Sequence, residues 1–73
     1  MYRNLKAEMA RAGLNSTQMA EKIGITKQGF SQKISGQANW NIAEMQKIQE
    51  ILDNKLEQML SLDYLFEFDV EED

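Results

Sequence analysis

Residues 16–35 read STQMAEKIGITKQGFSQKIS and form the most informative segment of the chain. Apolar residues recur there at helical spacing on both sides of Gly24, which is typical of two short helices joined by a tight turn. Such a turn needs a small residue where the helices cross, a residue that tolerates positive φ, and an apolar residue on the second helix. Ala20, Gly24 and Phe30 stand at these three places. The two helices are predicted over residues 16–23 and 26–35.

The starts of these two helices carry capping signals. Asn15 and Gln18 have the spacing of a capping box ahead of the first helix, and Thr26 is a favourable N-cap for the second. Gly24 and Gly36 stand where a glycine commonly ends a helix.

A first helix is predicted ahead of this segment. Residues 2–12 are rich in helix-forming side chains, and Leu5 and Met9 lie one turn apart as an apolar stripe. Gly13 follows at the position where a glycine in the left-handed conformation commonly ends a helix. The chain is therefore expected to enter the central segment directly from this helix.

A fourth and a fifth helix are predicted behind the central segment. Asn41 and Glu44 have the spacing of a capping box, so we expect a helix that follows Asn41 and ends at Asp53 and Asn54. Its apolar residues are Ile42, Met45, Ile48, Ile51 and Leu52. The next helix is expected from Lys55 onward, unless the fourth and fifth helices run on as one. Its apolar residues would be Leu56, Met59 and Leu60. Together the five elements predict an all-α fold.

The sequence pattern changes after the fifth helix. Over residues 64–70 apolar and polar side chains alternate with a period of two, which is typical of an extended chain. We therefore divide the chain into a domain over residues 1–61 and a short extended acidic C-terminal arm over residues 62–73. The arm would pack on its own domain, exchange with a second copy or dock on another protein, and we favour pairing in a homodimer. Its expected contact residues are Tyr64, Phe66 and Phe68.

The residue types present exclude several classes of protein. The chain of 73 residues contains no cysteine, histidine or proline, which excludes disulfides, thiolate or imidazole zinc sites, and mechanisms that need a His base or a Cys nucleophile. No nucleophile, base and phosphate-binding loop converge, so neither an enzyme nor a cofactor is expected. The acidic run at residues 69–73 lacks the ligand spacing of a calcium loop, and no metal site is expected. No apolar run suits a signal peptide or a membrane span.

The net charge of −4 conceals a division of the chain. Residues 1–36 carry six basic and two acidic side chains, a net charge of +4, whereas residues 37–73 carry two basic and ten acidic side chains, a net charge of −8. Because affinity for phosphate comes mainly from Lys and Arg, the first part has the charge expected of a nucleic-acid-binding surface. The second part would support that surface or face something else.

A longer pattern surrounds the two central helices. Its elements are Ala20, Gly24 and Phe30 at spacings of four and six, Gly13-Leu14 before the second helix, the run SQKISG at residues 31–36, and Asn39 ahead of a capped fourth helix. Over about residues 3–60 the sequence resembles the helix-turn-helix domains of the phage Cro and repressor type, and a pattern of this length is far more specific than a lone motif. Family members often carry a basic residue near Gln37, whereas the loop here is uncharged.

The resemblance implies a five-helix, repressor-like helix-turn-helix domain whose third helix enters the major groove of DNA while the second crosses the backbone. The residues that it places at base edges are Lys27, Gln28, Ser31 and Gln32. The residues that it places near phosphates are Ser16, Thr17, Lys33, Gln37, Asn39 and Asn41. The chemistry suits this assignment, because Gln pairs bidentately with adenine and Lys donates to the acceptors of guanine.

Two functions are compatible with these expectations. The first is a sequence-specific regulator of transcription, of phage or bacterial origin and located in the cytoplasm of the bacterial host cell, that binds a double-stranded DNA operator as a homodimer. The second is a protein-interaction module that has kept the helix-turn-helix fold and binds a repressor or a transcription component through its acidic, aromatic second half. The motif and the charge of residues 1–36 favour the first.

Overall fold

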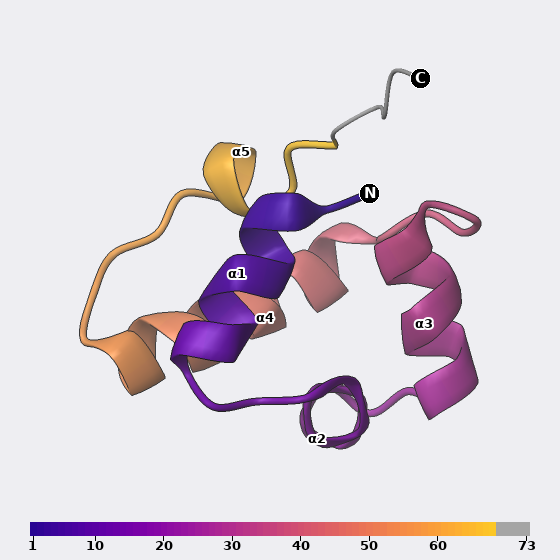
Figure 1. Cartoon of the computed structure of the whole chain (residues 1–73), viewed down its shortest axis with the longest axis horizontal. Coiled ribbons are helices and arrows are strands. Elements are labelled where there is room, and N and C mark those ends of the chain that lie inside the picture. Colours follow the sequence, from indigo (N-terminus) through magenta and orange to yellow (C-terminus); the bar gives the residue numbers. More distant parts are fainter. Residues whose placement is uncertain (69–73) are drawn as a thin grey trace.

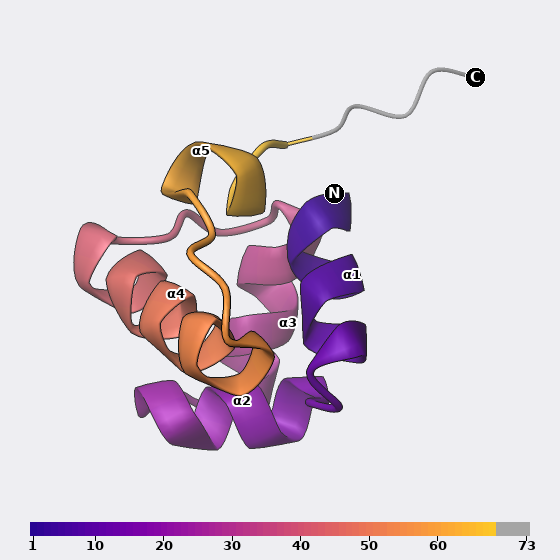
Figure 2. The same cartoon turned by 90° about the vertical axis from the view of Figure 1, so that its left-hand side faces the viewer.

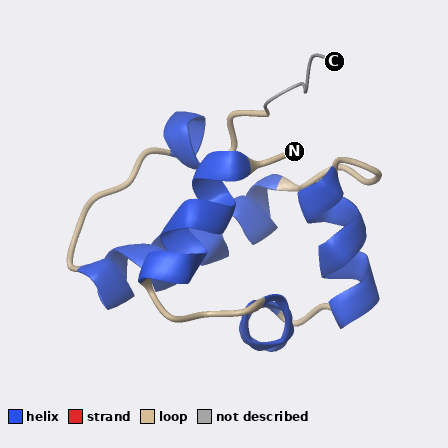
Figure 3. Ribbon diagram, in the orientation of Figure 1, coloured by secondary structure: helices blue, strands red, loops and turns tan. Residues whose placement is uncertain are grey.

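The computed structural model describes residues 1–68, and these form five α-helices and no strand (Figures 1 and 3). The helices are α1 (Arg3–Arg11), α2 (Ser16–Ile23), α3 (Lys27–Ser35), α4 (Ile42–Leu56) and α5 (Leu62–Leu65). α2 contacts α3 and α4, α1 contacts α4, and α5 contacts both α1 and α4. The predicted all-α, five-helix architecture is confirmed.

The ends of α2 and α3 are fixed by local hydrogen bonds that the sequence predicts. Asn15 Oδ1 accepts from the Gln18 N–H at 2.8 Å, and Gln18 Oε1 accepts from the Asn15 N–H at 3.0 Å, which completes a capping box. Thr26 Oγ1 caps α3 by accepting from the Gly29 N–H at 3.0 Å. Gly24 ends α2 with φ of +82°, a conformation that glycine adopts without steric cost. The turn that sets α3 against α2 is thus determined locally.

One buried core joins all five helices. Its members are Leu5, Met9, Leu14, Met19, Ala20, Ile23, Phe30, Ile48, Leu52 and Leu65. Each helix contributes at least one of these side chains, so none of the five is an appendage. Figure 2 shows α5 at the end of the molecule where α1 begins. This short helix therefore closes the core at that end.

α4 is longer than the sequence predicts. The prediction that Asp53 and Asn54 end it was wrong, because the helix continues to Leu56. Leu52 is fully buried in the core, and this burial outweighs the weak helix propensity of the two polar residues that follow it. Asp53 Oδ1 accepts from the Leu60 N–H at 2.8 Å. Its carboxylate therefore stabilises the following loop instead of ending the helix.

A loop replaces the predicted fifth helix over residues 57–61. Glu57 caps α4 in the left-handed conformation with φ of +53°, which turns the chain away from the helix axis. Met59, predicted on the apolar side of a helix, is 97% exposed. The Leu60 carbonyl accepts from Gln49 Nε2 at 2.7 Å, so this end of the loop is held against α4. The apolar spacing predicted a helix here, but of residues 57–61 only Leu60 packs on the core.

The start of the predicted extended arm is helical and belongs to the core. Ser61 Oγ accepts from the Tyr64 N–H at 3.1 Å and caps α5. Leu65 is fully buried, whereas Tyr64 is exposed, the reverse of what a period of two predicts. A helical turn explains the difference, because a helix places residues three apart on the same side, whereas an extended chain does so for residues two apart. The part of the arm that includes Val70 lies outside the described residues.

We expect Leu65→Ala to lower the free energy of unfolding by about 2–4 kcal/mol, because it removes a fully buried side chain from a small core. Urea unfolding followed by circular dichroism measures the change. Met59→Ala is the control, since an almost fully exposed side chain should alter stability by no more than about 0.5 kcal/mol. Equal stability of the Leu65 variant and the wild-type protein would contradict the placement of α5 in the core.

Candidate nucleic-acid interface

α3 presents a polar face to solvent. Phe30 is the buried residue of this helix. Over residues 27–32, the exposed side chains lie on the sides of the helix that face away from Phe30. They are Lys27, Gln28, Ser31 and Gln32. Their spacing places them on one side of a helix, so the structure brings together the four residues predicted at base edges. Figure 1 shows α3 at the margin of the molecule.

An aromatic cluster supports α3 from the core side. The rings of Phe30 and Trp40 meet edge to face with centroids 5.4 Å apart, and Trp40 meets Phe66 at 5.5 Å and Tyr2 at 6.3 Å in the same manner. Edge-to-face pairs add to the stabilisation that burial provides. Ile42, one of the apolar residues of α4, is 60% exposed. Trp40 packs against the core at this end of α4 in its place.

Lys33 is engaged in an ion pair within the protein. Its Nζ contacts Glu44 Oε2 and lies 5.9 Å from the centroid of the Trp40 ring. Glu44 is only 8% exposed. Its other oxygen accepts from the Asn41 N–H at 3.1 Å, while Asn41 Oδ1 accepts from the Glu44 N–H at 2.8 Å. One carboxylate therefore joins α3 to the capped start of α4, and the lysine predicted near phosphate already has a partner.

The surroundings of Glu44 favour its ionised form. Burial alone would raise the pKa of this carboxyl. The hydrogen bond from Lys33, the Asn41 N–H and the charge of Lys33 together outweigh burial and hold the pKa of Glu44 below its ordinary value. The ion pair is therefore a feature of the folded protein at neutral pH.

The other predicted phosphate contacts lie on two elements. Ser16 and Thr17 open α2, and Gln37, Asn39 and Asn41 belong to the loop over residues 36–41 that joins α3 to α4. All except Ser16, which is half-buried, are exposed. The Asn41 side-chain oxygen is used in the cap of α4, which leaves its amide nitrogen for other contacts.

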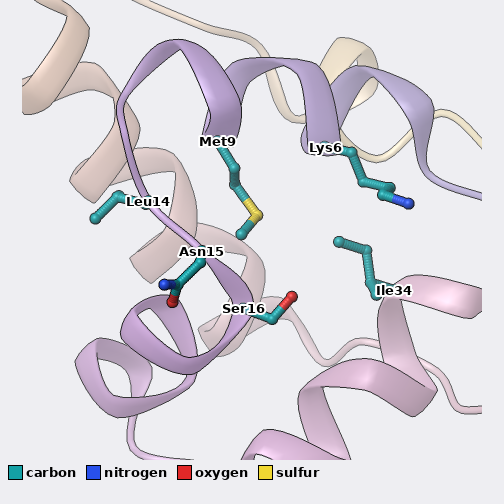
Figure 4. Close-up of a pocket in the computed structure, with 6 residues that line it drawn as sticks. All are labelled: Lys6, Met9, Leu14, Asn15, Ser16 and Ile34. Carbon is teal, nitrogen blue, oxygen red and sulfur yellow. The ribbon is translucent and has the colours of Figure 1, made fainter.

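A pocket of about 210 Å³ lies between α1, the start of α2 and the end of α3 (Figure 4). Its lining residues are Lys6, Met9, Leu14, Asn15, Ser16 and Ile34. Figure 4 shows the Ser16 hydroxyl pointing into the pocket, with Lys6 on the α1 side. Lys6 was not predicted as a contact residue, because net charge alone does not distinguish it from the other basic residues among residues 1–36.

The three predicted dimer or partner contacts touch their own domain. The Tyr64 hydroxyl donates to Glu8 Oε2 at 2.7 Å, and Arg11 pairs with Glu8 Oε1 at 2.6 Å. The hydrogen bond to Glu8, burial and the charge of that carboxylate raise the pKa of Tyr64. Phe66 belongs to the aromatic cluster, and Phe68 meets the Tyr2 ring at 5.1 Å. Contacts within the chain therefore occupy part of the surface that we predicted to bind a second copy or another protein.

Within residues 1–68 no three acidic side chains come together in a way that would hold a metal ion. No helix of this region has the length and apolar character needed to cross a bilayer.

Comparison with protein-family models gives a match to the Cro/C1-type HTH DNA-binding domain over residues 4–63. The matched region includes α1 to α4 almost entirely and the start of α5. It therefore confirms the resemblance carried by the residues around the two central helices. Searches among curated proteins and among solved structures find no match.

The lowered pKa of Glu44 makes stability depend on pH. A carboxyl with a depressed folded-state pKa contributes stability that is complete above its unfolded pKa, about 4.3, and is lost as the pH falls through the folded value. We expect the free energy of unfolding to decrease more steeply from about pH 5 to pH 3 in the wild-type protein than in Glu44→Gln.

Urea titrations at a series of pH values measure these slopes. Glu50→Gln, which changes an exposed glutamate of the same helix, is the control and should keep the wild-type pH dependence. Parallel curves for the Glu44 variant and the wild-type protein would contradict the stabilising role of the ion pair.

Proposed function

Since the chain belongs to the Cro/C1-type family of helix-turn-helix DNA-binding domains, we propose that it is a transcriptional regulator that reads a specific double-stranded DNA sequence with α3. The observation that carries the proposal is the exposed polar face of α3, fixed from behind by the buried ring of Phe30. The function needs neither a catalytic group nor a cofactor, because recognition rests on hydrogen bonds and charge.

The side chains of this face suit direct contact with base edges. Gln28 and Gln32 lie one helical turn apart, so they can meet neighbouring base pairs, each pairing bidentately with N6 and N7 of adenine. Lys27 can donate to O6 or N7 of guanine, and the Ser31 hydroxyl suits either kind of base.

Phosphate contacts would fix the register of α3 on the duplex. Ser16 and Thr17 stand at the N-terminal end of α2, where backbone N–H groups and the helix dipole favour an anion. Lys6 lines the same pocket as Ser16, and we add it to the proposed phosphate contacts. Gln37 and Asn39 are exposed in the loop after α3 and offer neutral donors there.

A homodimer is the proposed binding unit. One domain offers four side chains to base edges, and two half-sites about one turn of DNA apart would double the sequence read. Tyr64 and Phe68 keep exposed area after their contacts with their own domain, and with Phe66 they stay our prediction for the dimer contact. We also propose that the protein is a small repressor of phage or bacterial origin, on the basis of the helix-turn-helix pattern and the positive charge of residues 1–36.

Selection of bound duplexes from a random library tests the proposal. We expect enrichment of a two-fold symmetric site, and we expect Gln28→Ala and Gln32→Ala each to relax the base preference at one position of each half-site. The loss at such a position should be about 1–3 kcal/mol. Absence of salt-dependent duplex binding by the folded protein would contradict the proposed function.

Lys6→Ala tests the phosphate contact that the structure adds. We expect weaker binding to all duplexes alike, and a slope of log K against log salt that is smaller by about one. Fluorescence anisotropy at several salt concentrations gives this slope. Lys47→Ala, on the exposed surface of α4, removes the same charge elsewhere and should leave the slope unchanged. Equal effects of the two substitutions would show that only net charge matters.

A further inference from the structure

Glu57 ends α4 in a backbone conformation that favours glycine. Its φ of +53° lies in the left-handed region, which costs free energy for a residue with a side chain. The other residues of positive φ within residues 1–68 are all glycines, namely Gly13, Gly24 and Gly36. The cost at Glu57 would be removed if α4 continued past it as a helix.

The connection from α4 to α5 has the sequence of a helix. Residues 57–60 read EQML, and all four are good helix formers. Leu56, Met59 and Leu60 have helical spacing, yet Met59 is 97% exposed in the folded chain. Figure 1 shows this connection along the outer margin of the molecule. A helix continued from α4 would therefore agree with the propensity of the segment and relieve Glu57.

The closed loop is held by few contacts. The Leu60 N–H donates to Asp53 Oδ1 at 2.8 Å, and the Leu60 carbonyl accepts from Gln49 Nε2 at 2.7 Å. Of residues 57–61 only Leu60 packs on the core. A continued helix would replace these bonds by its own backbone hydrogen bonds. Opening the loop thus exchanges one set of hydrogen bonds for another.

α5 and the residues after it are held largely by the start of the chain. The Tyr64 hydroxyl donates to Glu8 at 2.7 Å, and Asn4 Nδ2 donates to the Tyr64 carbonyl at 2.9 Å. The Phe66 and Tyr2 rings meet edge to face with centroids 6.2 Å apart. None of these contacts involves the connection after α4. The α5 of a second copy can therefore make every one of them.

We propose that two copies of this chain exchange α5 together with residues 66–68, and that residues 57–61 are the hinge. In the exchanged dimer α4 continues through the hinge, and the α5 of each copy closes the core of the other. Exchange repeats existing contacts between two chains, and a short hinge under strain favours it. The inference rests on the proposed function in one respect, because it names how the proposed homodimer is held together.

Thiol crosslinking distinguishes exchange from any other dimer. The chain contains no cysteine, and Asn4 Nδ2 lies 3.2 Å from Glu67 Oε2. An Asn4→Cys protein and a Glu67→Cys protein are unfolded in urea, refolded together at high concentration and treated with a short bis-maleimide. We expect a covalent dimer on a denaturing gel, because exchange brings the two thiols together across chains. Each variant refolded alone is the control and should remain uncrosslinked.

Glu57→Gly tests the hinge. Glycine adopts the left-handed conformation without cost and weakens a continued helix, so both effects favour the closed monomer. Because each dimer contains two hinges, we expect the dissociation constant of the dimer to rise by at least about 10-fold in analytical ultracentrifugation. Gln58→Gly is the matched control, since it weakens the helix without a left-handed residue to relieve. Equal effects of the two substitutions would overturn the part assigned to Glu57.

These experiments use no DNA, so their outcomes separate the inference from the function beneath it. A wild-type protein that stays monomeric at millimolar concentration, or a dimer that gives no crosslink between the mixed variants, would overturn the exchange. Selection of a two-fold symmetric DNA site would then leave the proposed function standing with another dimer contact. Exchange by a protein that binds no duplex would support the inference and contradict the proposed function.

Discussion

The burial of Phe30 is the contact on which the arrangement of the domain depends. Phe30 is the buried side chain of α3, so the direction in which that helix presents its polar face follows from how this one ring packs. Trp40 meets it edge to face at 5.4 Å. Trp40 in turn contacts rings that belong to the start of the chain and to the segment after α5. Distant parts of the sequence therefore determine where the polar face of α3 points.

A second constraint acts on α3 near its C-terminal end. The carboxylate of Glu44 pairs with Lys33 and completes the capping box of α4, so one buried side chain restricts two helices. A buried ion pair of this kind contributes little net free energy compared with apolar packing, but its loss leaves a charge without a partner. Its main contribution is orientation. Together with Phe30 it limits both the tilt and the rotation of α3.

The sequence predicted well wherever the determinant was local. The capping boxes at Asn15 and Asn41, the Thr26 cap and the left-handed glycines follow from residue types a few positions apart, and all were confirmed. The errors began at Asp53, where burial of the neighbouring Leu52 and a hydrogen bond to the Leu60 N–H outweighed helix propensity. These determinants are tertiary contacts, which a single sequence does not display.

The candidate site shows the same division. The polar face of α3 could be predicted, because its spacing is helical and the cap at Thr26 fixes where the helix begins. The pairing of Lys33 with Glu44 could not, since eleven residues and a loop separate the two. The nearness of Lys6 to Ser16 could not be predicted either, because it depends on where the folded chain places α1 relative to the start of α2. The net charge of residues 1–36 therefore overstates the positive charge that they can offer to a phosphate, since Lys33 is already paired.

The position of Trp40 has a practical consequence for the study of this molecule. It is the one tryptophan of the chain, and its indole nitrogen is buried without a hydrogen-bond partner. Its ring touches Tyr2, Phe30 and Phe66, so it senses the start of the chain, α3 and the segment after α5 at once. Tryptophan fluorescence therefore gives an intrinsic optical signal of changes at these contacts. Comparing substitutions at Phe66 and at Phe30 separates the part of the signal that reports the segment after α5 from the part that reports α3.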